Sequence, residues 1–284
     1  MLVEYPLEKQ VNLIPLFNEH QRLTAIINHA LANRTGNVLV DDVDKPRVAW
    51  LTFFTVNILA GDSQGEEARE ILARIPKHQM ILVPTEEWER LLKKTWGKRL
   101  ISRKRTKFSS KDLDIEHVRK LKEPLADGFT VERIDQKNAD DFDEYLADVF
   151  FSFYGSKEKF LDEGFGFCIK EGDKIVSAAA TGTTPHNKAF EIQVAAVRQR
   201  KYRHKGLATV ACAYLIEYSL ENGYEPRWDA DNKISAKFAS KLGYADPESY
   251  NIYFHTKIAV LVLRKLHIGK IIRFAHWIRG KTII

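Results

Sequence analysis

The sequence predicts an α/β fold in two parts, and three observations lead to this prediction. Segments of β-branched and apolar residues alternate with segments of helical period along most of the 284 residues. That length fits about two domains of roughly 150 residues each. A strand, a basic turn and an apolar helix follow one another without a gap over residues 191–218. The hydrophobic share of 44% and the charged share of 29% are those of an ordinary soluble globular protein.

The N-terminal part is predicted to alternate helices with strands. A helix is expected over residues 7–33, because its apolar residues recur at helical spacing and Asn33 to Gly36 provide a stop. The predicted strands cover 38–40, 48–56, 80–83 and 100–108, and the predicted helices cover 66–74 and 85–97. Residues 111–126 are charged and linker-like, so a domain boundary is expected after residue 126.

The second part is predicted to run from residue 127 to residue 256. It is expected to begin with a strand over 129–134 and a helix over 139–150, followed by a hairpin around Glu171-Gly172-Asp173. The remaining elements, in order, are a central strand over 191–197, a helix from Leu207, a strand ending at Ala230, a helix after Asn232, and final strands up to about Thr256.

The turn after the central strand concentrates positive charge. Its basic residues are Arg198, Arg200, Lys201, Arg203 and Lys205. Gly206 then opens the helix, and a glycine there lets a ligand approach the unpaired N–H groups of the first turn, where the helix dipole favours an anion. The spacing Arg203-x-x-Gly206-x-Ala208 therefore predicts a phosphate cradle that matches neither a Walker loop nor Gly-x-Gly-x-x-Gly. The alternative is that Gly206 and Ala208 are only close-packing positions, and that Arg200 and Lys201 are solvated surface.

These residues resemble the acetyl-CoA-binding core of the GNAT N-acetyltransferases, whose fingerprint is Gln/Arg-x-x-Gly-x-Gly/Ala after a splayed central strand. A second motif, Asn232-x-x-Ser235 with Gly243-Tyr244 after the helix, is similar to the family's Asn-x-x-Ala and Gly-Phe. Residues 164–244, from Gly164-Phe165-Gly166-Phe167-Cys168 to Gly243-Tyr244, and residues 36–42 resemble the zwittermicin-resistance type of GNAT protein. The resemblance implies a C-terminal GNAT fold over 127–256, with a mixed, mostly antiparallel central sheet flanked by helices. Residues 1–126 are interpreted as an N-terminal α/β domain that is a degenerate GNAT-like repeat.

The resemblance further implies that acetyl-CoA is the cosubstrate and that no metal takes part. The residues implied to bind acetyl-CoA are Val194, Ala195, Ala196, Val197, Arg198, Arg203, His204, Lys205, Gly206, Leu207, Ala208, Thr209, Asn232 and Ser235. The strand backbone would pair with the pantetheine amides, and the basic turn would hold the phosphates. Asn232 has a second interpretation as the N-cap of its helix, and Ser235 as helix surface.

Glu191 is the candidate catalytic residue, because an acid on a central strand is costly to bury unless it is used or paired. GNAT enzymes often place a general base on this strand; the alternative is a Glu that pairs across the sheet. Ala239 stands where the family usually has the general-acid Tyr, so no acid is assigned. We therefore expect an acetyl-CoA-dependent N-acetyltransferase acting on a primary amine of a small molecule or peptide. The alternative is a non-catalytic acetyl-CoA-binding protein.

The number of cysteines and the N-terminal sequence predict the cellular compartment of the protein. Only Cys168 and Cys212 are present, both in apolar runs, which excludes a disulfide framework or a zinc site. No signal peptide and no apolar stretch of membrane-spanning length is readable, so a cytoplasmic protein is expected.

The net charge of +6 is concentrated in the predicted tail, residues 257–284, which carries seven Lys or Arg and no acid. The rest of the chain is close to neutral, which disfavours a nucleic-acid partner. Five apolar residues of the tail fall on one helical stripe: Ile268, Ile271, Ile272, Ala275 and Ile278. We favour docking of this stripe on the body or on a second subunit of a homodimer over peripheral contact with an anionic membrane.

Overall fold

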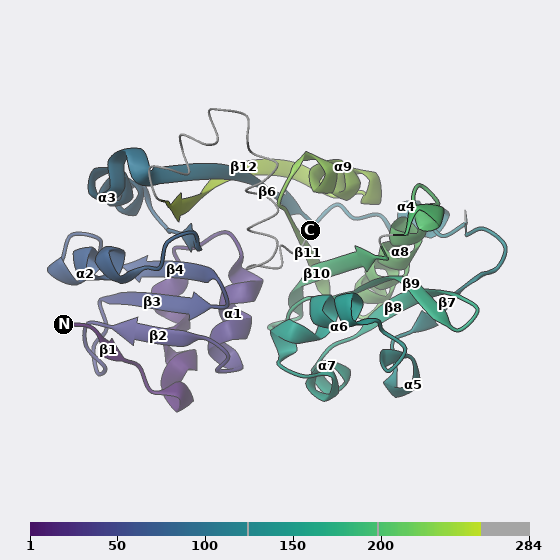
Figure 1. Ribbon diagram of the computed structural model, residues 1–284, viewed down its shortest axis with the longest axis horizontal. Coiled ribbons are helices and arrows are strands. Elements are labelled where there is room, and N and C mark those ends of the chain that lie inside the picture. Colours follow the sequence, from purple (N-terminus) through teal and green to yellow (C-terminus); the bar gives the residue numbers. More distant parts are fainter. Residues whose placement is uncertain (124, 198, 257–284) are drawn as a thin grey trace. The chain divides into compact units, whose positions relative to one another are not determined.

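The computed structural model describes residues 1–123, 125–197 and 199–256, which form two compact units. Unit 1 combines Met1–Arg105 with the strand residues from Tyr250 onward, and unit 2 is Thr106–Ser249 (Figure 1). The predicted domain boundaries after residues 126 and 256 remain a prediction. The tail over 257–284 and Arg198 of the basic turn lie outside the described residues.

Unit 1 consists of a β-sheet and the helices that pack against it. Its strands are β1 (Val3–Glu4), β2 (Asn37–Val40), β3 (Val48–Phe53), β4 (Val56–Gly61), β5 (Met80–Leu82) and the parts of β6 (Leu100–Ser109) and β12 (Ala245–His255) that belong to this unit. Its helices are η1 (Leu7–Phe17), α1 (Thr24–Ala32), α2 (Glu66–Arg74), α3 (Glu86–Trp96) and η2 (Gly97–Arg99). The order is β1-β2-β3-β4-β5-β12-β6, antiparallel from β1 to β4 and parallel between β4 and β5, which α2 connects.

Unit 2 repeats this plan. Its strands are β7 (Phe129–Arg133), β8 (Gly166–Glu171), β9 (Lys174–Thr181), β10 (Ala189–Ala196) and β11 (Glu225–Ala230). Its helices are α4 (Ile115–Lys120), α5 (Gln136–Ala139), α6 (Glu144–Phe151), η3 (Ser152–Tyr154), α7 (Lys157–Glu163), η4 (Arg200–Tyr202), α8 (Leu207–Glu221) and α9 (Lys233–Leu242). The strands from β7 to β10 are antiparallel, and β10 and β11 form a parallel pair connected by α8.

Both units therefore have antiparallel strands that end in one parallel pair, with a helix connecting that pair. In each unit, the strand beyond the parallel pair comes from the other half of the sequence. Tyr253 and Phe254 of β12 pair with β5, and residues 106–108 of β6 pair with β11. The predicted fold class, a mixed and mostly antiparallel sheet flanked by helices with a related N-terminal repeat, is confirmed.

Four predicted elements were wrong in detail. The expected helix over 139–150 begins only at Glu144, because Asp143 caps the start of α6. The expected helix over 7–33 is two helices, because Pro15 lies inside the 3-10 helix η1 and Leu23 has a left-handed φ of 54° at the start of α1. The expected strand over 48–56 is a hairpin instead, since Phe54 adopts a φ of 52° between β3 and β4. The linker-like segment contains α4, which Arg119 and Lys122 tie to Glu217 of α8.

In unit 2 the helices that matter for the site lie against the central strands. The apolar helix α8 packs against β8, β9 and β10, and α6 packs against β10 (Figure 1). Among the largest fully buried side chains here are Phe150, Phe160 and Phe190. This core holds β10 in place and fixes the start of α8 beside its end.

Candidate cofactor and catalytic site

The central strand β10 separates from its parallel neighbour part of the way along. The two strands are in register at Ala189, Phe190 and Glu191, opposite Glu225, Pro226 and Arg227. From Trp228 onward β11 pairs with β6 on its other side, while β10 continues to pair with β9 as far as Ala196. Within the described residues, β10 thus has a free edge from Ile192 to Ala196, as the splayed strand of the sequence prediction requires.

The backbone groups along this edge alternate in direction. The Gly182 N–H donates to the Glu191 carbonyl at 2.7 Å, and the Val197 N–H donates to the Val176 carbonyl at 2.9 Å. Since successive residues of a strand direct their N–H and C=O groups to opposite sides, Val194 and Ala196 direct theirs away from β9 and towards the free edge. Ala195 and Val197 are instead engaged with β9, and the Ser177 hydroxyl donates to the Ala195 carbonyl at 3.0 Å.

The start of α8 has the geometry expected of an anion site. Gly206 is its N-cap at φ 74°, with no side-chain cap, and a Cβ added there would meet no atom within 4 Å. The first intrahelical bond runs from the Val210 N–H to the Gly206 carbonyl at 3.0 Å, which leaves the earlier N–H groups of the first turn without helix acceptors. These groups belong to Leu207, Ala208 and Thr209, and next to them Arg203, His204 and Lys205 are exposed.

Two further basic residues of the turn lie within the described residues, Arg200 and Lys201. Lys201 forms an ion pair with Glu171 at 2.6 Å, and the Tyr202 hydroxyl donates to the same carboxylate at 2.8 Å. The hydrogen bond from Lys201, together with that from Tyr202, lowers the pKa of the Glu171 carboxyl. Lys201 thus has a structural partner on the hairpin β8–β9, and both Lys201 and Arg200 are exposed.

The second motif has a structural role at the start of α9. The Asn232 side chain accepts hydrogen bonds from the N–H groups of Ile234 at 2.9 Å and Ser235 at 3.0 Å, so its N-cap interpretation is correct. The Ser235 hydroxyl accepts from the Trp228 indole N–H at 3.2 Å, which ties α9 to β11. A contact of either residue with a cofactor stays a prediction.

Glu191 lies on β10 at the last residue paired with β11, half-buried and directly before the free edge. Its N–H donates to the Thr183 hydroxyl at 3.1 Å, and its carbonyl accepts from Gly182, so the backbone at this point is fixed on both sides. Glu191 is therefore the residue of β10 at which the two strands part.

No general acid is found at Ala239, the position that the resemblance to the GNAT family points to, and two buried tyrosines of unit 2 do not supply one. Ala239 is fully buried in the core of unit 2. Tyr244 is close enough to Glu191 for the charge of that carboxylate to act on it, but its phenol donates to the Pro226 carbonyl at 3.0 Å. Burial, with smaller effects of Cys212 and Glu191, raises the pKa of Tyr244 well above its ordinary value. Tyr154 is likewise a core residue, hydrogen-bonded to Thr181 at 2.7 Å.

Unit 1 lacks the positive charge that lies beside the start of α8 in unit 2. The turn that corresponds to the basic one runs from β4 to α2 and carries Asp62, and α2 begins with Glu66 and Glu67. Carboxylates at a helix N-terminus take the place that a phosphate would occupy, and they repel it. Unit 1 thus has a similar strand topology without a basic turn before the corresponding helix.

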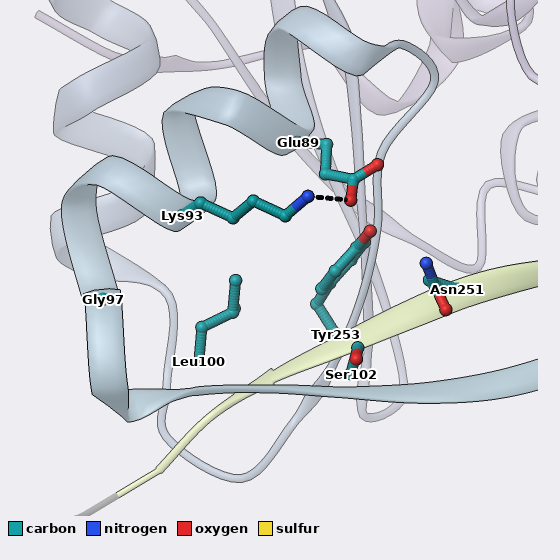
Figure 2. A pocket seen from close by; sticks show the side chains of 7 residues that line it. All are labelled: Glu89, Lys93, Gly97, Leu100, Ser102, Asn251 and Tyr253. Carbon is teal, nitrogen blue, oxygen red and sulfur yellow. Dashed lines mark ion pairs between the residues drawn. The ribbon is translucent and has the colours of Figure 1, made fainter.

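A cavity of about 460 Å³ lies in unit 1, and no motif in the sequence pointed to it. Figure 2 shows its lining, in which Glu89 and Lys93 of α3 pair at 2.5 Å beside Tyr253 of β12. The spacing of Glu89 and Lys93 was visible in the sequence as an ordinary helix pair, but the arrival of β12 beside them was not. Across the described residues, none of the helices has the length and apolar character that crossing a bilayer requires.

Comparisons with known proteins agree with the geometry of unit 2. A family model described as GNAT acetyltransferase matches residues 14–253. The chain is 24% identical over 264 residues to the uncharacterized N-acetyltransferase YdfB of Bacillus subtilis (strain 168), covering 89% of this chain and 98% of that protein.

Solved structures show the same relation. A GCN5-related N-acetyltransferase-like protein from Streptococcus suis 89/1591 is 26% identical, with a TM-score of 0.69 over 88% of this chain and 99% of that chain. A tandem GNAT protein from the clavulanic acid biosynthesis pathway is 11% identical with a TM-score of 0.53, over 89% and 98% of the two chains, and shares the fold. Since the family model spans most of the sequence, the chain belongs to the GNAT acetyltransferase family and is an N-acetyltransferase.

Proposed function

We propose that unit 2 binds acetyl-CoA and transfers its acetyl group to a primary amine of a small molecule or peptide. The observation that carries this proposal is the free edge of β10, which begins directly after Glu191 and leads to the open N-terminus of α8. The pantetheine amides would pair with the outward backbone groups of Val194 and Ala196. The phosphates would lie at Gly206 and Ala208, with Arg203 and Lys205 beside them.

Different groups would carry out the separate parts of the reaction. Acetyl-CoA supplies an activated thioester. A free primary amine with a pKa near ~10 is mostly protonated at neutral pH, so a base is needed, and we assign that role to Glu191. Backbone N–H groups on the free edge would donate to the thioester oxygen as negative charge develops there. Because Ala239 cannot donate, we assign protonation of the departing thiolate to water.

We further propose that the protein works in the cytoplasm. Cys168 and Cys212 are both buried free thiols, and burial raises the pKa of Cys212 above its usual range. Such inert thiols suit a reducing compartment. Homodimer formation and docking of the tail remain part of this proposal, with the tail's apolar stripe as the sequence feature that supports them.

Calorimetry with acetyl-CoA should give one binding site per chain. Unit 2 offers the basic turn, whereas unit 1 has Asp62, Glu66 and Glu67 at the corresponding turn. Binding should also raise the melting temperature, since ligand at ~100 times Kd stabilises the folded state by about 2.7 kcal/mol. Two equivalent binding sites would contradict the expectation that the acidic turn of unit 1 excludes acetyl-CoA. An absence of binding would contradict the assignment of acetyl-CoA as the cosubstrate.

Turnover should appear as thiol release that depends on an added amine. The full-length protein is incubated with acetyl-CoA and a panel of small primary amines, amino sugars and peptides with free N-termini, and free CoA thiol is measured. Release with at least one amine, above the amine-free rate, is expected. Saturable acetyl-CoA binding without release across the panel would instead favour the non-catalytic alternative that Ala239 suggests.

A further inference from the structure

Unit 1 contains a buried histidine without a hydrogen-bond partner. His255, near the end of β12, is only 8% exposed and stacks on the Trp96 ring with centroids 4.6 Å apart and planes 4° from parallel. Neither of its ring nitrogens has a hydrogen-bond partner among the described residues. A buried imidazole always carries at least one N–H donor and one further nitrogen, so an unpaired ring calls for an explanation such as a bound ion.

Among the described residues, the side chains whose charge acts on the pKa of His255 are the basic groups of Arg99, Lys77 and His78. Burial lowers its pKa most, and Arg99, Lys77 and His78 lower it further. The backbone holds these segments together, since the His78 N–H donates to the His255 carbonyl at 2.8 Å and the Thr256 N–H donates to the Arg99 carbonyl at 3.0 Å. The loop before β5, the 3-10 turn η2 and the end of β12 therefore meet at this ring.

Lys77 and Arg99 have no acidic partner in the part of the chain that the structure describes. Both are exposed. Two cations of the neighbouring helix α3 behave differently, because Arg90 pairs with Glu87 at 2.5 Å and Lys93 with Glu89 at 2.5 Å. Two of the three cations of α3 are thus paired with carboxylates, whereas Lys77 and Arg99 are not paired within the described residues.

We propose that Lys77, Arg99 and His255 form a binding site for the phosphate group of a small phosphate monoester. A phosphate group carries about −1.5 to −2 charge at neutral pH, which matches the two permanent charges of Lys77 and Arg99. Its several acceptor oxygens suit donors that converge from three segments, and an Arg guanidinium can bind two of them at once. The His255 ring at the base of the site would donate one further hydrogen bond when protonated. This site lies in unit 1 and does not depend on the proposed acetyl-CoA site in unit 2.

The test uses the full-length protein and inorganic phosphate, with glycerol phosphate as a second probe, at constant ionic strength maintained with chloride. The ring C–H signals of His255 are followed by NMR and assigned with a His255→Gln variant. Both probes should shift these signals in a saturable way towards the protonated form, because a bound anion favours the charged imidazole. Arg99→Gln and Lys77→Gln should each weaken binding by ~10-fold, as expected for loss of a charged hydrogen bond.

Two variants serve as matched controls. Lys94→Gln removes the same charge from an exposed position of α3 and should change phosphate binding by less than about 2-fold. Arg203→Gln disrupts the basic turn of unit 2 and should leave the His255 response unchanged, which separates the two sites. The proposal is overturned if chloride alone produces the same shifts, if Lys94→Gln weakens binding as much as Arg99→Gln, or if only vesicles containing phosphatidic acid, and neither free probe, produce the response.

Discussion

The variant Glu191→Gln should lower kcat by ~10²-fold or more on any amine that the wild type acetylates. Glutamine keeps the size of the side chain and its hydrogen-bonding reach, but it cannot accept a proton from the amine. Acetyl-CoA affinity should change by less than about 2-fold, since the cofactor groups are expected along Val194 and Ala196 and at the start of α8. Steady-state kinetics together with calorimetry on the same preparation measures both quantities.

Glu132→Gln is the matched control for this experiment. Glu132 is an exposed carboxylate on β7, at the far end of the strand order from β10 within unit 2, and its loss removes the same charge. Its kcat should stay near that of the wild type. If Glu191→Gln turns over as fast as Glu132→Gln throughout the pH range in which both stay folded, Glu191 is a structural residue.

The variant Gly206→Glu should abolish measurable acetyl-CoA binding. The new carboxylate would stand at the open N-terminus of α8, where we place a phosphate. Two unit charges ~4 Å apart repel by about 4 kcal/mol at an effective dielectric constant of ~20, which corresponds to a loss of roughly 10³-fold in affinity. The left-handed φ of 74° adds a backbone cost of about 1–2 kcal/mol, which lowers stability for any residue with a Cβ.

Gly155→Glu separates the charge effect from the backbone effect. Gly155 is exposed, has a φ of 85°, and a Cβ added there meets nothing within 4 Å, as at Gly206. This variant should lose similar stability in thermal unfolding and still bind acetyl-CoA. Gly206→Asn tests the position without charge, because asparagine tolerates the left-handed region, and should weaken binding by less than ~10-fold. Retained affinity in Gly206→Glu would rule out a phosphate at this turn.

Local sequence signals predicted the strand β10 and the helix α8, because the residues that determine each element lie close together in the sequence. The apolar run of β10, the glycine at 206 and the helical period after it all lie within one short stretch, so register and capping follow from local chemistry. The Asn232 cap was readable for the same reason. The hairpin at Phe54 was not, since a left-handed aromatic residue carries no turn signal in the sequence.

Long-range pairing is the part that the sequence could not provide. Tyr253 faces Ile81 and Trp228 faces Phe108 across neighbouring strands, pairs of residues that no spacing or motif connects. The cavity beside Glu89 and the surroundings of His255 both depend on where β12 arrives. Predicting either feature would have required knowing which strands pair with β12.

The strand β12 also affects how the protein is made. Residues 250–255 occupy the position between β5 and β6 in unit 1, yet they are among the last of the described chain to be synthesised. Until they leave the ribosome, β5 presents an unpaired edge that other chains could join. The N-terminal half of the protein thus completes its sheet only after almost all of the C-terminal half has been translated, so a ribosome that stops early releases an unfinished N-terminal unit rather than a finished domain.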